Sequence, residues 1–591
     1  MRTVFKQVVD PVAGSLGLSA LCAVLPLLTL FALLGVLRVK AWIAGLVSLA
    51  VAIVVAIVAF RMPVGQSLLS ALEGAAFGFF PILWIVINAI WIYNLTVESG
   101  HFDVLRRSFA TVSPDMRIQA IIIAFCFGAL LEALAGFGTP VAITVVMLMT
   151  IGFSPLRAAA LSLIANTAPV AFGALAAPIT ALATVTHGAN PDPRLTIDTL
   201  GAMVGRQTPI LAAVVPLVLV FVADGRRGLR EAWAPALAAG VTFGAAQFVA
   251  SNYISVPLTD IVAALASAAV VVLMVRGRRD RVPAHAMASA GTAPTAERRA
   301  VTTSGAPGGV GATVGEDLGE APGGQAPRDR GTAPVDGAGE LPYTRAEVLR
   351  AYAPYAIIIV LFVLANLAPV KAALAEKPWT TPFAWPGLHV LSASGKPIAT
   401  TTFAFGWLPA AGTLLLIAGI LTAVVLRIPP GRALATYGRT YAELKWAIVT
   451  VMAVLALAYV MNLSGQTASL GAYLARAGGF FAFLSPILGW IGVAVSGSDT
   501  SSNALFGALQ VQTAARAGLD PVLLAAANSS GGVLGKMISP QNLAIAAAAV
   551  GMAGREGDIF RRVFGWSLVL LLIMCVLVFL QSTTVLSWMV P

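Results

Sequence analysis

Long apolar runs separated by short polar or basic segments recur along almost the whole 591-residue chain. A run of about 20 apolar residues is long enough to cross the hydrocarbon core of a bilayer, and about twelve such runs are predicted to be full transmembrane helices. They cover residues 15–37, 41–60, 71–97, 157–180, 203–223, 233–254, 258–276, 351–370, 407–427, 446–463, 521–550 and 564–588. The ten-residue alternation typical of outer-membrane barrels is missing. The pattern therefore predicts an all-α polytopic membrane protein.

Two further apolar stretches, 118–153 and 484–519, are too long for one helix and are broken near their middles by glycine and small polar residues. Each is predicted to be a re-entrant hairpin or a pair of short helices. Lysine and arginine accumulate in cytoplasmic loops, and grouping the basic clusters on one face leaves both termini outside. The first stretch then enters the membrane from the cytoplasm, and the second enters from the opposite face.

The chain is predicted to divide into two repeats joined by a polar linker. The divisions are 1–230 for the first repeat, with hairpin 118–153 and broken helix 157–180; 231–282 for a linking helix pair; 283–341 for the linker; and 342–591 for the second repeat, with hairpin 484–519 and broken helix 521–550. The linker is rich in Gly, Ala, Pro and Thr and lacks apolar periodicity. We expect it to be disordered and cytoplasmic.

Three short motifs occur in the same order in both repeats. The first repeat contains EALAGFGTPVAI, GFSP and ANTAPVAFGALAAP, and the second contains SGSDTSSNALFG, GLDP and ANSSGGVLGKMISP. The last pair shares an asparagine, a glycine and a proline at the same spacing, as Asn166, Gly173 and Pro178 and as Asn528, Gly535 and Pro540. Because the repeats insert with opposite sense, they indicate an inverted-topology secondary transporter, with substrate bound near the midplane by interrupted helices.

Polar residues are expected to interrupt the helices at 166–167, 498–503 and 528–532. Irregular backbone at membrane depth is tolerated only where it is buried in protein or lines a cavity, and the N-terminus of a half-helix attracts a carboxylate. Packing between helices is the alternative role for such side chains. The candidate substrate-binding residues are Gly138, Thr139, Asn166, Thr167, Ser498, Thr500, Ser501, Ser502, Asn503, Asn528, Ser529, Ser530, Lys536 and Gln541.

Three ionisable residues are predicted to lie at membrane depth and are functional candidates for that reason. Glu132 and Asp499 are the candidates for carrying a proton, since a desolvated carboxyl group can take up and release one. Lys536 is expected either to attract an anion or to neutralise Asp499 in a structural pair. Glu73 and Arg206 are expected near span ends, where solvated or snorkelling roles are the simpler interpretation.

Composition limits the alternatives. The formal net charge of +11 in a chain with only 11% charged residues is attributed to cytoplasmic loops rather than to a nucleic-acid partner. The three cysteines lie in apolar segments, so no metal site is expected. The GGVLGKM segment departs from a nucleotide-binding loop at Ser530 and Met537. We therefore expect neither an ATP-driven pump nor an enzyme, and no cofactor beyond a coupling ion.

Several longer blocks resemble the L-lactate permease family of bacterial inner-membrane carriers. They are LLEALAGFGTPVAI, IANTAPVAFGA, MVGRQTP, GWIGVAVSGSDTSSNALFGALQ and AANSSGGVLGKMISPQNLAIA. The resemblance covers nearly the whole chain except the 283–341 linker. It implies proton-coupled import of L-lactate, with D-lactate and glycolate as related substrates, by alternating access in the inner membrane. More distantly, the chain resembles the ion-transporter superfamily.

The residues leave some alternatives open. The family usually has Gly-Ala-Ala where this chain has Ala133, Leu134 and Ala135, so the choice between lactate and glycolate stays open. Serine, threonine, asparagine and backbone carbonyls could also bind Na⁺ at the same breaks, which makes a sodium-coupled carrier of another small carboxylate the alternative. The lipid bilayer and a small hydroxy-monocarboxylate are the expected partners, and homo-oligomerisation is undecided.

Overall fold

The computed structural model describes residues 4–279 and 344–591, except residues 38, 111, 137, 394, 396, 399, 400, 553 and 554. In this part of the chain the protein is mostly helical. By length and composition, ten helices can cross a membrane, or up to eleven when one bent pair is counted as a span. The protein is therefore a multi-pass membrane protein. The 283–341 linker lies outside the described residues.

The helices of the first half precede residue 280. They are α1 (Leu16–Phe31), α2 (Ala41–Val58), α3 (Val64–Phe77), α4 (Trp84–Glu98), α5 (His101–Ala110), α6 (Met116–Ala120), α7 (Gly128–Ala135), α8 (Thr139–Thr150), α9 (Pro155–Ala165), α10 (Gly173–Thr186), α11 (Ile197–Val249) and α12 (Thr259–Arg279). The long α11 is two helices joined at a kink, where Asp224 and Gly225 leave the helical conformation. The two predicted spans 203–223 and 233–254 lie on either side of this kink.

The second half adds ten helices among its described residues and most of the short strands. The helices are α13 (Arg345–Asn366), α14 (Ala368–Ala375), α15 (Ala411–Val425), α16 (Pro430–Ser464), α17 (Gln466–Leu474), α18 (Phe481–Ser496), α19 (Asp499–Ala517), α20 (Pro521–Gly535), α21 (Pro540–Ala549) and α22 (Glu556–Gln581). The predicted span 407–427 corresponds to α15, which has only 15 residues. It therefore falls short of the length for a full crossing.

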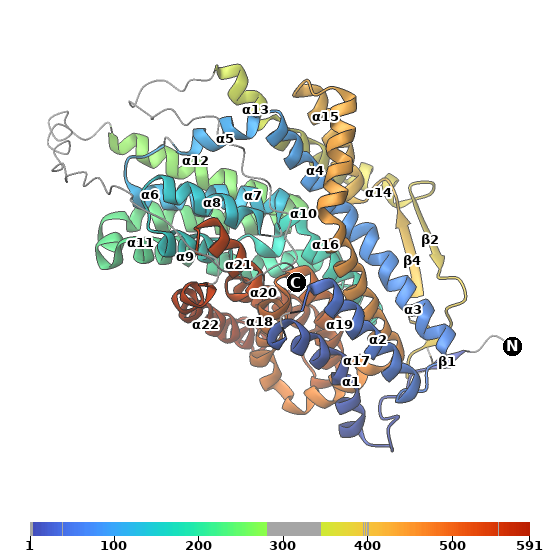
Figure 1. The fold of residues 1–591 in the computed structure, drawn as a ribbon. Helices are drawn as coiled ribbons and strands as arrows, with labels where there is room; N and C mark the ends of the chain where they lie inside the picture. The colour runs from blue at the N-terminus through green and yellow to red at the C-terminus, as the bar shows by residue number, and fades with distance from the viewer. Residues whose placement is uncertain are drawn as a thin grey trace, which may run out of the picture.

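Short strands lie along the edge of the bundle. β2 (Thr380–Ala384) and β4 (Thr402–Gly406) form an antiparallel pair beside α3, while β1 (Phe5–Lys6) pairs in parallel with β3 (Val390–Leu391) (Figure 1). Phe77 of α3 packs on Phe403 of β4, with ring centroids 4.4 Å apart. The sheet thus fixes the loop between α14 and α15 against the helices.

Two apolar cores organise the helices. The larger core includes the α7–α8 hairpin together with α9, α11, α12, α20 and α22. The second core is formed mainly by α1, α2, α16 and the start of α4, with one face of α19, and α3 packs against it. Helix α10 contributes Leu175 and Ile179 to the first core and Ala177 and Ala181 to the second. It therefore lies at the boundary between them.

Each half contains a helical hairpin with a glycine at its tip. In the first, α6 continues through a π-helical segment, Ile121–Phe127, into α7, and Gly138 begins the return helix α8 with φ of 88°. In the second, Gly497 joins α18 to α19 with φ of 74°. Both glycines adopt the left-handed conformation that side chains disfavour. The tips can turn sharply for this reason.

A broken helix follows each hairpin. Between α9 and α10 the chain bends by 62°. Helix α20 runs without interruption through Gly535, and the chain breaks only at the 3₁₀ turn Lys536–Ile538. The predicted break at 528–532 is therefore wrong. The glycines there serve helix packing, because a Cβ on Gly531 would lie 2.2 Å from the carbonyl oxygen of Pro486 in α18.

The hairpins and broken helices of the two halves pack reciprocally. Helix α10 packs on α19, the second leg of the second hairpin, and α21 packs on α8, the second leg of the first. The helices that follow repeat this exchange, since α11 packs on α20 and α22 packs on α9. Elements that correspond in the sequence repeat thus make corresponding contacts in space.

Ion pairs at the ends of the spans join loops that the sequence places on the same side. Arg194 pairs with Asp192 and with Asp520, each at 2.7 Å, on the predicted outer face. The hydrogen bond from Arg194 lowers the pKa of Asp192 from its ordinary value. On the predicted cytoplasmic face, Arg117 pairs with Glu231 at 2.7 Å. The Arg194–Asp520 pair ties the two halves together at one surface, and the Arg117–Glu231 pair ties the first hairpin to α11 at the other.

At the break between α9 and α10, the first turn of α10 contains three consecutive left-handed residues, none of which is glycine. Ala174, Leu175 and Ala176 have φ angles of 44°, 49° and 61°. This conformation costs roughly 1–2 kcal/mol per residue for L-amino acids. The surrounding packing must therefore hold the turn in place.

Replacing Ala174 by glycine should raise the free energy of unfolding by about 1 kcal/mol, because glycine removes the left-handed strain. Ala174→Val should lower it by about 2 kcal/mol, because a β-branched side chain tolerates this φ least. Thermal unfolding of both variants in detergent measures the difference. Equal destabilisation by glycine and valine would contradict a strained turn.

Candidate functional site

A cavity lies where the two hairpin tips meet the first helix break and Lys536 at the second. It contains about 380 Å³ of empty space, counting the part open to solvent. The lining residues are Glu132, Gly136, Val170, Gly173, Ala174, Ala177, Pro178, Gly497, Ser498, Asp499, Thr500 and Lys536. Both halves of the chain therefore build its wall.

A buried ion pair joins the two halves at this wall. Lys536 Nζ donates to Glu132 Oε1 at 2.6 Å, and the two side chains are 7% and 3% exposed. Asn166, at the end of α9, donates to the other carboxylate oxygen, Oε2, at 2.9 Å. Both oxygens of Glu132 are thus bound. Of the two roles considered for Lys536, the structural pair with Asp499 is not formed, because the lysine pairs with Glu132.

The backbone at Gly173 gives the Glu132 side chain its space. A Cβ on Gly173 would lie 2.8 Å from Glu132 Oε1 and 3.1 Å from its Cγ. In the first repeat, the glycine shared by the two motifs is therefore required because a larger residue would displace the Glu132 side chain. In the second repeat, Gly535 has a different one, because its Cβ would lie 2.3 Å from the carbonyl oxygen of Trp490.

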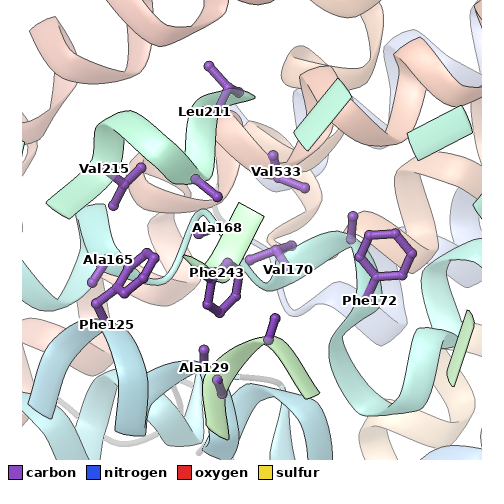
Figure 2. Close-up of a cluster of buried hydrophobic side chains, with 14 of the residues drawn as sticks. Phe125, Ala129, Ala165, Ala168, Val170, Phe172, Leu211, Val215, Phe243 and Val533 are labelled. Carbon is purple, nitrogen blue, oxygen red and sulfur yellow. The ribbon is translucent and has the colours of Figure 1, made fainter. Parts of the chain in front are cut away.

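Apolar side chains surround the first helix break and hold it in place. Figure 2 shows Val170 and Phe172 of the break among Leu211 and Phe243 of α11 and Val533 of α20. These side chains are nearly or fully buried. The ion pair thus sits beside a dry, closely packed segment, where electrostatic interactions are stronger than in water.

Asp499 forms the opposite side of the site. Its Oδ2 accepts hydrogen bonds from Ser529 at 2.6 Å and from Asn503 at 3.3 Å. Its Oδ1 has no hydrogen-bond partner among the described residues. A Cβ on Gly532 would lie 2.4 Å from that oxygen, so the glycine makes room for it. One oxygen of this buried carboxyl group, packed against α20, is therefore left for a proton.

A chain of amides holds Asp499 in position. Asn528 donates to Asn503 at 2.9 Å, and Gln510 donates to Asn528 at 3.2 Å. Asn503 also donates to the carbonyl oxygen of Pro178 at 3.1 Å. Asn503 and Asn528 thus connect the second hairpin to both broken helices, and they do not line the cavity. Asn166 and Asn528 each tie a broken helix to the hairpin of the same repeat.

The structure brings together only part of the predicted binding set. Ser498, Thr500 and Lys536 line the cavity, with the two candidate proton carriers. The others lie in the walls and the tips. Those that bind side chains of the site or backbone carbonyls are Asn166, Asn503, Asn528, Ser529, Thr167 and Ser502, the last two donating to the carbonyls of Ile164 and Gly489. Gly138 packs on Ile545, Gln541 is exposed beside Gly497, Thr139 is half-buried at the first tip, and Ser501 and Ser530 are buried.

The sequence interpretation missed several cavity-lining or buried positions. Val170, Ala174 and Ala177 line the cavity as apolar wall, and composition gave no signal for them. Glu73 was expected near a span end, but it is fully buried where α3 packs on α16. This expectation is wrong, because Gly74 lets α3 approach Tyr459 closely. Asp260 is also fully buried. It could have been identified from the sequence, because it is an acidic residue within an apolar run.

Comparison with known proteins gives a consistent result over the whole chain. The L-lactate permease family matches residues 19–585. The L-lactate permease of Bacillus subtilis (strain 168) is 38% identical and covers 99% of this chain and 100% of its own. The glycolate permease GlcA of Escherichia coli (strain K12) is 40% identical over 96% of each chain, and the L-lactate permease of the same strain is 38% identical over 99% and 100%.

One solved structure, the YdaH transporter of Alcanivorax borkumensis, aligns with 86% of this chain and 87% of its own. The TM-score is 0.44 and the sequence identity is 15%.

Gly173→Ala should displace the Glu132 carboxylate and leave Lys536 without its counter-ion, lowering the free energy of unfolding by about 3 kcal/mol. Gly565→Ala in α22 is the matched control, because its Cβ would meet nothing within 4 Å. Thermal unfolding in detergent, repeated in a Lys536→Met background, measures the coupling. A Gly173→Ala effect of the same size in both backgrounds would show that it does not act through the ion pair.

Proposed function

The chain belongs to the L-lactate permease family, and we propose that it imports L-lactate across the bacterial inner membrane together with a proton. D-lactate and glycolate are the related substrates, as the glycolate permease among its relatives suggests. These relatives are permeases, which transport their substrates and are not enzymes. The observation that carries the proposal is the Glu132–Lys536 ion pair in the wall of a cavity shared by both halves.

The cavity suits a small hydroxy acid. Of the residues that line it, Lys536 alone is basic, so its ammonium group is the natural partner of a substrate carboxylate. Ser498 and Thr500 lie on the same wall as Asp499, and both carry a hydroxyl group. These groups can hydrogen-bond a 2-hydroxyl. The apolar side formed by Val170 and Ala177 leaves space for a methyl group or a hydrogen.

Charge balance couples the substrate to a proton. A buried charge without a partner costs several kcal/mol. When a substrate carboxylate takes Lys536, Glu132 loses its counter-ion and becomes neutral by binding a proton. The net charge of the site is then the same with substrate and proton as without them. Substrate binding and proton binding therefore favour each other. The loaded carrier can then change between its outward-facing and inward-facing states without moving net charge across the membrane.

The arrangement of helices favours alternating access. The reciprocal packing of α10 on α19 and of α21 on α8 supports inverted-topology repeats, the architecture in which one unit moves against the other around a central site. The cavity adjoins α10, where the two apolar cores meet. Movement of one core against the other would expose the site to each side in turn. About twelve spans, some formed by two shorter helices, complete this architecture.

Glu132→Gln should lose uptake driven by an inward proton gradient by about 100-fold, because the amide cannot take up a proton. Exchange of labelled for unlabelled L-lactate should persist, since exchange needs no net proton movement. Lys536→Met should lose both activities, because the substrate carboxylate loses its partner. Reconstituted proteoliposomes with labelled L-lactate and glycolate measure each activity.

Glu376→Gln is the control, because this carboxylate is exposed outside the spans and its loss should leave both activities unchanged. Uptake by the wild type that depends on sodium and ignores the pH gradient would contradict proton symport and favour the sodium-coupled alternative. Normal proton-driven uptake by Glu132→Gln would remove Glu132 from the coupling step.

A further inference from the structure

A third carboxyl group lies near the site and has no role in the steps above. Asp260, in the first turn of α12, is fully buried. Its Oδ1 accepts a hydrogen bond from Gln247 at 3.3 Å, while its Oδ2 has no partner in the described part of the chain. Buried carboxyl groups within transmembrane segments are costly, and they mark proton or ion pathways.

Gln247 connects Asp260 to the helix break behind Glu132. Its Nε2 also donates to the carbonyl oxygen of Ala168 at 3.3 Å, and its Oε1 accepts from Thr208 at 3.1 Å. Ala168 follows Asn166, which binds Glu132, by two residues. Helix α12, which carries Asp260, also packs on α7, which carries Glu132 and through it the ion pair with Lys536. The carboxyl group is therefore part of the electrostatic environment of the ion pair.

Polar side chains continue from Gln247 toward the end of the span. Ser251 lies one helical turn further, and its hydroxyl occupies the space over Gly205, where a Cβ would lie 1.8 Å from Oγ. Asn252 donates to Ser251 at 3.1 Å and accepts from Arg206 at 2.9 Å. The sequence places this end of α11 on the outer face. A row of polar groups thus leads from that face toward Asp260.

We propose that Asp260 is the outer proton acceptor of the carrier and passes its proton to Glu132. The proposal rests on the proton symport proposed above. A hydronium ion on the outer side gives a proton to Asp260 Oδ2 and leaves as water, and the resulting carboxylic acid gives the proton to the Glu132 carboxylate as the substrate takes Lys536. Asp260 is then ionised again, and the N-terminus of α12 stabilises its charge. Glu132 releases the proton on the cytoplasmic side.

The titratable and charged groups near Asp260 are consistent with proton transfer from Asp260 to Glu132. Among the described elements packed on α12, α7 carries Glu132, which pairs with Lys536, and α11 carries Arg206, which binds Asn252. Cys126 binds Ser267, two turns further along α12. Asp198 of α11 and Tyr253 lie at the outer end with mostly exposed side chains. Glu132 is thus the acceptor that the described residues offer.

Asp260→Asn should lower uptake driven by an outer acid pH by about 100-fold, while lactate exchange stays within about twofold of wild type. Asp260→Glu keeps a carboxyl group and should recover a measurable part of the driven uptake. Asp198→Asn, an exposed acid at the same end, is the control and should change neither activity. The assay uses the full chain in proteoliposomes, across a range of outer pH at constant inner pH.

Wild-type rate and pH dependence in Asp260→Asn would overturn the proposal. Loss of exchange together with driven uptake in folded protein would also overturn it, because Asp260 would then only support the site. Failure of Asp260→Glu to recover driven uptake would do the same. Wild-type uptake that ignored the proton gradient would overturn both proton symport and the Asp260 route. Loss of driven uptake in Glu132→Gln but not in Asp260→Asn would overturn the Asp260 route alone.

Discussion

One ammonium group placed among buried carboxyl groups is the interaction on which the site depends. Lys536 is the basic residue among those that line the cavity, and Glu132 and Asp499 are the acids. In a low-dielectric interior the single positive charge of such a lysine neutralises one carboxylate at a time. The break at Lys536–Ile538, the bare backbone at Gly173 and the amide of Asn166 all serve to bring Glu132 to it. Competition for this lysine couples the substrate to the proton.

Close helix packing makes such a site tolerable inside a membrane. Gly489, Gly531 and Gly535 let α18 and α20 approach through their backbones, and the reciprocal contacts of the two halves repeat this arrangement around the cavity. Several polar groups that do not face the cavity are bound to each other, as in the chain from Gln510 through Asn528 to Asn503. The site is therefore held rigidly from two sides, while α10 lies at the boundary where the two cores meet.

Much of the fold follows from the sequence, because apolar length, glycine tips and the positions of basic loops are local signals. The paired motifs also located the two hairpins, the two broken helices and all three charged groups of the site. The partner of Lys536 was not predictable, since Glu132 lies 404 residues away and only packing decides between it and Asp499. The continuity of α20 through Asn528 depended on α18, which covers its glycines. Apolar wall residues such as Ala177 carry no chemical signal at all.

Infrared difference spectroscopy on the reconstituted protein tests the exchange at Lys536 most directly. Addition of L-lactate should produce a carboxylic-acid band, as Glu132 gives up the lysine and binds a proton, and Glu132→Gln should remove that band. A spectrum in which lactate binds without forming a carboxylic acid, or in which the band persists in Glu132→Gln, would contradict the account.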